Sequence, residues 1–146
     1  MKILYLCTGN SARSQMAEAF SRSIIPANAP IEVFSAGTEP AGLHPETVAV
    51  MQEVGVDMTG HRSKSTDEVP FDAMDIVVTL CDSARGACPA VPAGCRTIHW
   101  SLRDPASGGG SPEEVRRSFR EVREDVLACV KRLMFELAMS RGRPRG

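Results

Sequence analysis

The sequence has no long hydrophobic run, little net charge and few aromatic residues. No window approaches the roughly 18 apolar residues of a membrane span. The N-terminus has only about five apolar residues before Thr8, too few for the core of a secretion signal. A net charge of −1 argues against a general nucleic-acid binder, because such proteins are normally basic. We therefore expect a cytoplasmic protein that binds neither membranes nor nucleic acids.

Cysteine is present five times, an odd number in a chain without an export signal. This argues against a fixed disulfide framework and favours thiol chemistry or metal binding. The length of 146 residues, with 42% hydrophobic and 24% charged residues, is typical of one soluble domain. We predict a single domain over 1–140 and a flexible basic tail over 141–146, and we expect a monomer.

Apolar runs alternate with helical patterns along the chain. Strands are predicted at 3–7, 31–37, 75–80 and 96–100, and helices start near Ser14, His44 and Ser111. The last helix has a capping box, Ser111 with Glu114, and an apolar stripe that includes Cys129. Composition predicts a polar, irregular segment over 56–71 and a mobile loop over 82–94.

This alternation predicts an α/β fold, an open four-stranded parallel sheet with helices on both faces. Ligands bind at the carboxyl ends of the strands in such folds. Cys7, Ser35, Cys81 and Asp104 all follow predicted strands, so we expect them to converge at one edge.

The segment 7–14 joins the first strand to the first helix and predicts a cradle for an oxyanion. Backbone N–H groups of a tight turn and a helix N-terminus favour negative charge. Cys7 begins the segment and Arg13 closes it, and a thiol in such a place ionises easily. No Gly-Lys-Ser/Thr follows, so this is not a nucleotide-binding loop. The candidate binding residues are Thr8, Gly9, Asn10, Ser11, Ala12, Arg13 and Ser14.

A second group of thiols leaves several interpretations open. Cys81, Cys88, Cys95 and His99 are ligand types that zinc accepts, but their spacing is wider than in usual zinc sites. Thiol–disulfide exchange between Cys81 and Cys88 is favoured, and unrelated loop thiols are the remaining alternative. Asp104, followed by Pro105, suits a proton donor to a leaving oxygen, although such a pair often forms an ordinary turn.

Together, these motifs resemble the thioredoxin-coupled arsenate reductases, which share the low-molecular-weight protein tyrosine phosphatase fold. The resemblance extends from about Lys2 to the last helix. It rests on 7–14, Ser35-Ala36-Gly37, Val77 to Cys81, Cys88-Pro89, His99-Trp100 and Asp104-Pro105-Ala106.

The resemblance implies a role for each matching residue. Cys7 would attack arsenate held by Arg13 and the loop amides, and Asp104 would protonate the departing hydroxyl. Cys81 would attack Cys7, Cys88 would attack Cys81, and thioredoxin would reduce the final disulfide. Ser14 would hydrogen-bond the Cys7 thiolate and Asn10 would brace the loop. No cofactor and no metal are expected.

Two positions depart from the family pattern. Ala12 stands where some members have an additional cysteine. Some members bind potassium through Asn, Glu, Ser and Asp; Asn10, Glu18 and Ser35 match, but Lys64 replaces the Asp. We therefore predict no potassium dependence.

Several alternatives stay open. A tyrosine phosphatase would use the same Cys7, Arg13 and Asp104, but that family has aromatic residues after Asp-Pro, where this chain has Ala106-Ser107-Gly108. A non-catalytic oxyanion or redox sensor would need no Asp104. Mycothiol or glutathione systems are alternative reductants, and Cys95 could replace Cys88 as the resolving thiol.

Overall fold

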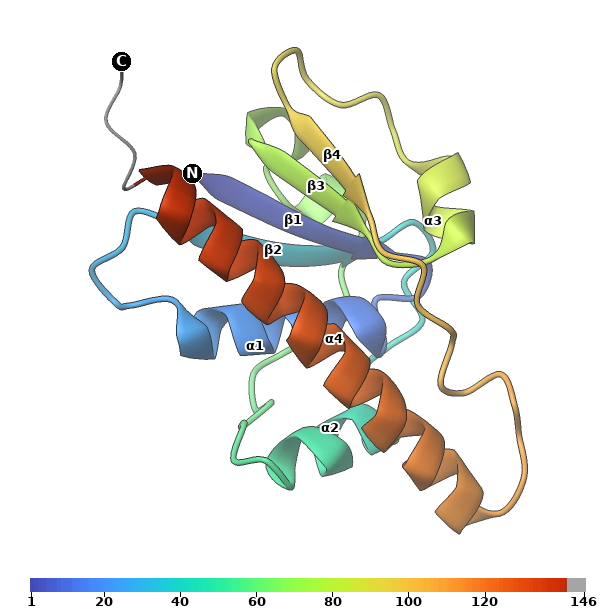
Figure 1. Cartoon of the computed structure of the whole chain (residues 1–146). Coiled ribbons are helices and arrows are strands. Elements are labelled where there is room, and N and C mark those ends of the chain that lie inside the picture. Colours follow the sequence, from blue (N-terminus) through green and yellow to red (C-terminus); the bar gives the residue numbers. More distant parts are fainter. Residues whose placement is uncertain (142–146) are drawn as a thin grey trace.

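The fold consists of one parallel sheet with helices packed around it (Figure 1). The structure, a computed structural model, describes residues 1–141. In chain order the elements are β1 Lys2–Cys7, α1 Arg13–Ile24, β2 Glu32–Gly37, α2 Pro45–Gln52, η1 Thr66–Glu68, η2 Phe71–Ala73, β3 Ile76–Thr79, α3 Asp82–Ala87, β4 Arg96–His99 and α4 Pro112–Arg141.

The four strands are all parallel and follow the order β2-β1-β3-β4. The predicted α/β fold with an open four-stranded parallel sheet is therefore confirmed. The register pairs Cys7 with Gly37, and Thr79 with both Leu6 and His99. The carboxyl ends of all four strands thus lie along one edge, where a ligand site is expected in such a fold.

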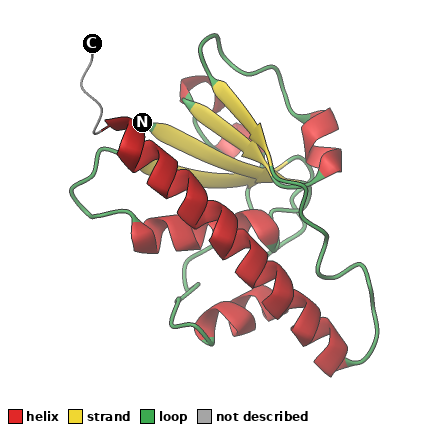
Figure 2. Ribbon diagram, viewed as in Figure 1, coloured by secondary structure: helices red, strands yellow, loops and turns green. Residues whose placement is uncertain are grey.

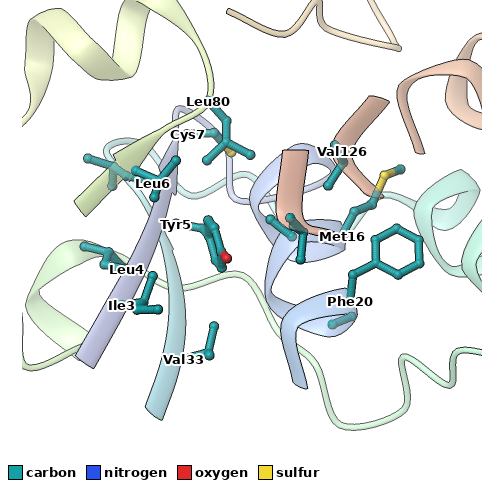
Figure 3. Close-up of a cluster of buried hydrophobic side chains, with 14 of the residues drawn as sticks. Ile3, Leu4, Tyr5, Leu6, Cys7, Met16, Phe20, Val33, Leu80 and Val126 are labelled. Atoms are coloured by element: carbon teal, nitrogen blue, oxygen red, sulfur yellow. The ribbon is translucent and has the colours of Figure 1, made fainter. Parts of the chain in front are cut away.

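The central strand β1 is buried on both of its faces. Ile3, Leu4, Tyr5 and Leu6 are fully buried, which explains why this strand reads as a continuous apolar run. Tyr5 points toward α1, while Leu4 and Leu6 lie on the other side of the strand (Figure 3). The Tyr5 hydroxyl lies 2.7 Å from the Ser21 hydroxyl, so its polar end has a partner inside the core.

Helices α1 and α4 pack together on one side of the sheet, with α2 against α4, and the short α3 lies near the carboxyl ends of β3 and β4 (Figures 1 and 2). Half of the predicted capping box is present at the start of α4: the Glu114 amide donates to the Ser111 hydroxyl over 3.2 Å, but the Glu114 carboxylate accepts from that hydroxyl and not from the Ser111 amide. The predicted apolar stripe is buried along α4, from Phe119 to Leu137. Cys129 is only half-buried beside it. No helix within residues 1–141 is long and apolar enough to cross a membrane.

The structure corrects the expected loop over 82–94, because residues 82–87 form α3. Two contacts explain the helix. The Cys81 side chain accepts a hydrogen bond from the Ala84 amide, and Ala84 is fully buried. Smaller differences are that α1 starts at Arg13 and that 56–71 contains the turn η1. Arg141 ends α4, while the rest of the predicted tail, 142–146, lies outside the described residues.

Candidate active site

The loop between β1 and α1 connects a buried thiol to a helix N-terminus. Cys7 is the last residue of β1 and is 2% exposed, and Arg13 is the first residue of α1. The N-cap residue of α1, Ala12, offers no side-chain hydrogen bond to the first turn. The amides of that turn therefore retain donors for a negatively charged ligand.

Ser14 is oriented as a hydrogen-bond donor to the Cys7 sulfur. The Ser14 hydroxyl lies 2.9 Å from the Cys7 Sγ. It also accepts a hydrogen bond of 2.8 Å from the Asn10 side-chain amide. Because the Asn10 contact occupies a lone pair, the hydroxyl proton is free to point at the sulfur.

Asn10 holds the loop in an unusual backbone conformation. Its φ of 48° is the only positive value for a non-glycine residue within residues 1–141. Its buried side chain accepts hydrogen bonds from the Lys64 amide over 2.8 Å and from the Gln15 side chain over 3.0 Å. This residue therefore braces the loop through two neighbouring segments, in keeping with the local hydrogen-bonding capacity that lets Asn adopt such angles.

Gly37, which belongs to the Ser35-Ala36-Gly37 motif, and residues that the sequence analysis did not single out support the loop. A Cβ at Gly37 would lie 2.6 Å from the Thr8 carbonyl oxygen, so only glycine fits there. The Ser63 hydroxyl donates to the Gly9 carbonyl over 2.9 Å, and Gln15 donates to the Arg62 carbonyl over 2.8 Å. These contacts join distant parts of the chain, and no local sequence pattern signals them.

An open pocket of about 550 Å³ lies beside the loop at the carboxyl edge of the sheet. Of the four residues that the sequence analysis expected to converge after strands, Cys81 and Asp104 line this pocket together with Arg13, whereas Cys7 and Ser35 are buried and do not line it. The Arg13 guanidinium donates to the Leu102 carbonyl over 2.9 Å. The pocket is lined by Thr8, Arg13, Cys81, Asp82, Ser83, Ser101, Leu102, Arg103 and Asp104.

Asp104 lies at the exposed rim of this pocket. One of its carboxylate oxygens accepts a hydrogen bond of 2.9 Å from the Ala106 amide, which forms an Asx turn and fixes the side chain. The carboxyl group remains open to the pocket and to solvent. This location suits a group that exchanges protons with a bound ligand and with water.

Cys81 is the second buried thiol of the site, at 7% exposure. Its Sγ lies 3.3 Å from the Thr8 hydroxyl and accepts a hydrogen bond of 3.4 Å from the Ala84 amide. Thr8 follows Cys7 directly, so one short contact connects the Cys7 loop to the start of α3. The two buried sulfurs therefore belong to one site.

Cys88 lies at the other end of α3 and is half-buried. Burial, together with a smaller effect of the nearby Cys95, raises the pKa of the Cys88 thiol. Cys81 and Cys88 are seven residue steps apart, which at about 1.5 Å of rise per step separates them by roughly 10 Å along α3. A disulfide needs Cα atoms about 4.4–6.8 Å apart. The pair can therefore join only if α3 unwinds.

The proposed zinc ligands are not brought together. His99 uses one ring nitrogen toward the Thr79 hydroxyl, at 2.7 Å, and the other toward the Asp82 carboxylate, at 2.8 Å. Within residues 1–141 no group of three or more His, Cys, Asp or Glu side chains could hold a metal ion. All five cysteines are free.

The potassium set of the family does not fit this chain. The Ser35 hydroxyl donates to the buried Glu18 carboxylate over 2.9 Å, so two of the matching residues lie together. Lys64, however, is half-buried beside them, with its ammonium bonded to the Arg62 carbonyl over 3.0 Å. Burial lowers the pKa of Lys64, while the charge of Glu18 acts in the opposite direction. Arg22 forms an ion pair with Glu18 at 3.4 Å, and Lys64 adds a second positive charge nearby.

The buried Cys7, the five-residue loop and Arg13 define a cysteine-dependent oxyanion site of the phosphatase type. The family model of the low molecular weight phosphotyrosine protein phosphatases matches residues 2–142. A curated relative, the arsenate reductase of Halalkalibacterium halodurans, is 40% identical over 129 residues, which cover 88% of this chain and 91% of the relative.

Two solved structures agree with this relationship. An arsenate reductase in its oxidised state has a TM-score of 0.77 at 32% identity, covering 92% of this chain and 97% of that one. A thioredoxin-dependent arsenate reductase of Corynebacterium glutamicum has a TM-score of 0.73 at 26% identity, covering 95% of this chain and 62% of that one. The chain thus belongs to the low molecular weight phosphotyrosine protein phosphatase family and, within it, to the arsenate reductases. The family and fold predicted from the sequence are confirmed.

Proposed function

We propose that this protein reduces arsenate to arsenite through a relay of three thiols, Cys7, Cys81 and Cys88, and that thioredoxin regenerates it. The observation that supports the proposal is the buried Cys81, which lines the pocket beside the loop and whose sulfur lies 3.3 Å from the hydroxyl of Thr8, the residue after Cys7. A hydrolytic phosphatase needs one thiol at this site, and a second buried thiol beside it suits electron transfer.

In the first step, the Cys7 thiolate attacks arsenic while the loop amides and Arg13 hold the oxyanion. The sulfur–arsenic bond forms, and one hydroxyl leaves as water after it takes a proton from Asp104. Arg13 can turn from the Leu102 carbonyl toward the ligand or contact both, because its guanidinium carries five donors. Ser14 stabilises the attacking thiolate through the contact described above.

In the second step, the Cys81 thiolate attacks the Cys7 sulfur. The Cys7–Cys81 disulfide forms, the sulfur–arsenic bond breaks, and its electron pair stays on arsenic. Arsenic is thereby reduced from the +5 to the +3 state and leaves as arsenite. The Thr8 hydroxyl and the Ala84 amide hold Cys81 at the pocket for this attack.

In the third step, Cys88 attacks Cys81, which releases the Cys7 thiolate and moves the disulfide to Cys81–Cys88. This step requires α3 to unwind, for the geometric reason given above. The dithiol of thioredoxin then supplies two electrons and two protons to the Cys81–Cys88 disulfide. Two protein thiols are therefore oxidised for each arsenite released before thioredoxin regenerates them. We further propose that the protein acts as a monomer in the cytoplasm, where free thiols such as its five persist.

Hydrolysis of a phosphate monoester is the second candidate function, because the matching family model is that of a phosphatase. It would use Cys7, Arg13 and Asp104 in the same way. The residues that line the pocket include no aromatic side chain to stack on a tyrosine ring, and Tyr5 is buried in β1. This composition favours a small inorganic oxyanion over an aryl phosphate.

Thiol counting tests the proposal. The reduced protein is incubated with arsenate, and lost thiols and released arsenite are measured for the wild type and for Cys7→Ser, Cys81→Ser and Cys88→Ser. We expect two thiols lost per arsenite, no product from Cys7→Ser, and a trapped Cys7–Cys81 disulfide in Cys88→Ser. Full arsenite turnover by Cys81→Ser would refute the relay, and brisk hydrolysis of aryl phosphates by that variant would favour the phosphatase.

A further inference from the structure

A chain of side chains connects the end of the sheet to the first residue of α3. The Thr79 hydroxyl lies 2.7 Å from the His99 Nδ1, and the His99 Nε2 lies 2.8 Å from the Asp82 carboxylate. The Ser101 hydroxyl donates to the same carboxylate oxygen over 3.2 Å. We refer to His99, Asp82 and Ser101 as the α3 latch. Nothing in the relay described above uses these contacts.

The protonation pattern of the latch follows from its partners. When Thr79 donates to Nδ1, a neutral His99 carries its proton on Nε2 and donates it to Asp82. The hydrogen bond from His99 also lowers the pKa of Asp82. The Asp82 side chain itself is mostly exposed, whereas His99 is 16% exposed. His99 therefore belongs to the sheet, at the end of β4, whereas Asp82 belongs to α3 and moves with it.

The latch acts on a helix that has little stability of its own. α3 contains six residues, and isolated helices shorter than about 12 residues are marginal in water. Its first residue, Asp82, follows Cys81 directly, and Cys88 follows its last residue. A contact that holds the first turn in place therefore favours the wound helix, in which Cys81 and Cys88 are too far apart to join.

We infer that His99 is a positioning residue that, through Asp82, holds α3 wound in the reduced protein and so opposes formation of the Cys81–Cys88 disulfide. This inference rests on the proposed relay. Loss of the latch should favour the disulfide, because the contact stabilises only the reduced protein, in which α3 is wound. Figure 1 shows α3 beside the carboxyl ends of β3 and β4, where the latch lies.

The test measures the equilibrium of the disulfide without arsenate. The parent is the full chain with Cys7→Ser, Cys95→Ser and Cys129→Ser, so that only Cys81 and Cys88 can pair. It is equilibrated in buffers of reduced and oxidised dithiothreitol, where oxidised dithiothreitol accepts the two electrons and two protons of the thiols. Acid quenching, alkylation and mass spectrometry then give the oxidised fraction.

We expect His99→Ala to raise the equilibrium constant for disulfide formation about fivefold, which lowers the reduction potential by about 20 mV. Asp82→Ala, on the surface, should shift it in the same direction, and the double variant should shift it no further than the larger single effect. His99→Gln, which keeps a side-chain N–H, should restore much of the parent value. Thr97→Ala is the control, an exposed β4 residue outside the latch.

Three results would overturn the inference: no shift in His99→Ala, additive shifts in the double variant, or an equal shift in Thr97→Ala. Each can occur while the parent still forms the disulfide, so the relay itself would stand. If the parent forms no Cys81–Cys88 disulfide at any buffer ratio, both the relay and the latch are refuted.

Discussion

Gly86 lies in the last turn of α3, and its replacement by Ala should slow the transfer of the disulfide to Cys88. A Cβ added at Gly86 meets no atom within 4 Å, and its φ lies outside the left-handed region, so the substitution introduces no clash. Ala favours a helix over Gly by about 0.5–1 kcal/mol. That difference makes the unwound form of α3 about two- to fivefold rarer.

A single-turnover experiment separates the affected step from the others. Reduced protein is mixed with excess arsenate in the absence of thioredoxin, quenched by alkylation at set times, and analysed by mass spectrometry for each disulfide. We expect the Cys81–Cys88 disulfide of Gly86→Ala to appear two- to fivefold more slowly. The Cys7–Cys81 disulfide, measured in a Cys88→Ser background, should form at the unchanged rate, because that step needs α3 wound.

Gly108→Ala provides the matched control, because a Cβ at Gly108 also meets nothing within 4 Å and the residue lies outside any helix. It should leave both rates unchanged. Equal slowing of both steps in Gly86→Ala would mean that the substitution disturbs the site as a whole. An unchanged Cys81–Cys88 rate would refute the requirement that α3 unwinds.

Three further predictions concern other contacts. Ser14→Ala should slow formation of the Cys7–arsenic bond about 10- to 100-fold, since a hydrogen bond to a charged group contributes about 1.5–3 kcal/mol; rapid-quench kinetics with an unchanged rate would contradict this. Replacing sodium by potassium at constant ionic strength should leave arsenite production unchanged, because Lys64 stands where the family has an Asp and Glu18 is already paired with Arg22. A clear rise would contradict this prediction. Hydrogen bonds from α4 arginines lower the pKa of Glu53 to about 2. This group therefore stabilises the fold above pH 4.5 and loses that effect as the pH falls toward 2, so the melting temperatures of wild type and Glu53→Gln should converge at pH 2.

The sheet and the loop 7–14 could be predicted because their signals are local. A continuous apolar run marks β1 as a buried strand, and a small-residue turn before an amphipathic pattern marks a loop at a helix N-terminus. The convergence of Cys81 and Asp104 on one pocket followed from topology alone, because parallel strands align their carboxyl ends.

The helix α3 could not be predicted, because tertiary contacts create it. Its sequence, with Gly86 and flanking Pro and Ala residues, has the composition of a loop. The Cys81 cap is local, but the burial of Ala84 and the contact of Asp82 with His99 depend on other elements of the fold. The supports behind the loop, such as Gln15, are equally nonlocal. A local sequence pattern predicts only those structures that are determined by contacts between neighbouring residues in the chain.

The same six residues must satisfy opposite needs in successive steps of the proposed relay. Attack on Cys7 needs α3 wound, because the Ala84 amide then bonds the Cys81 sulfur at the pocket wall. Attack by Cys88 needs α3 unwound, because the wound helix separates Cys81 and Cys88 by roughly 10 Å. A long, stable helix would block the second attack, and a disordered loop would not hold Cys81 for the first. A short helix that contains Gly86 and whose first residue is bonded through one exposed carboxylate suits both requirements, because helices of this length are marginal without such contacts.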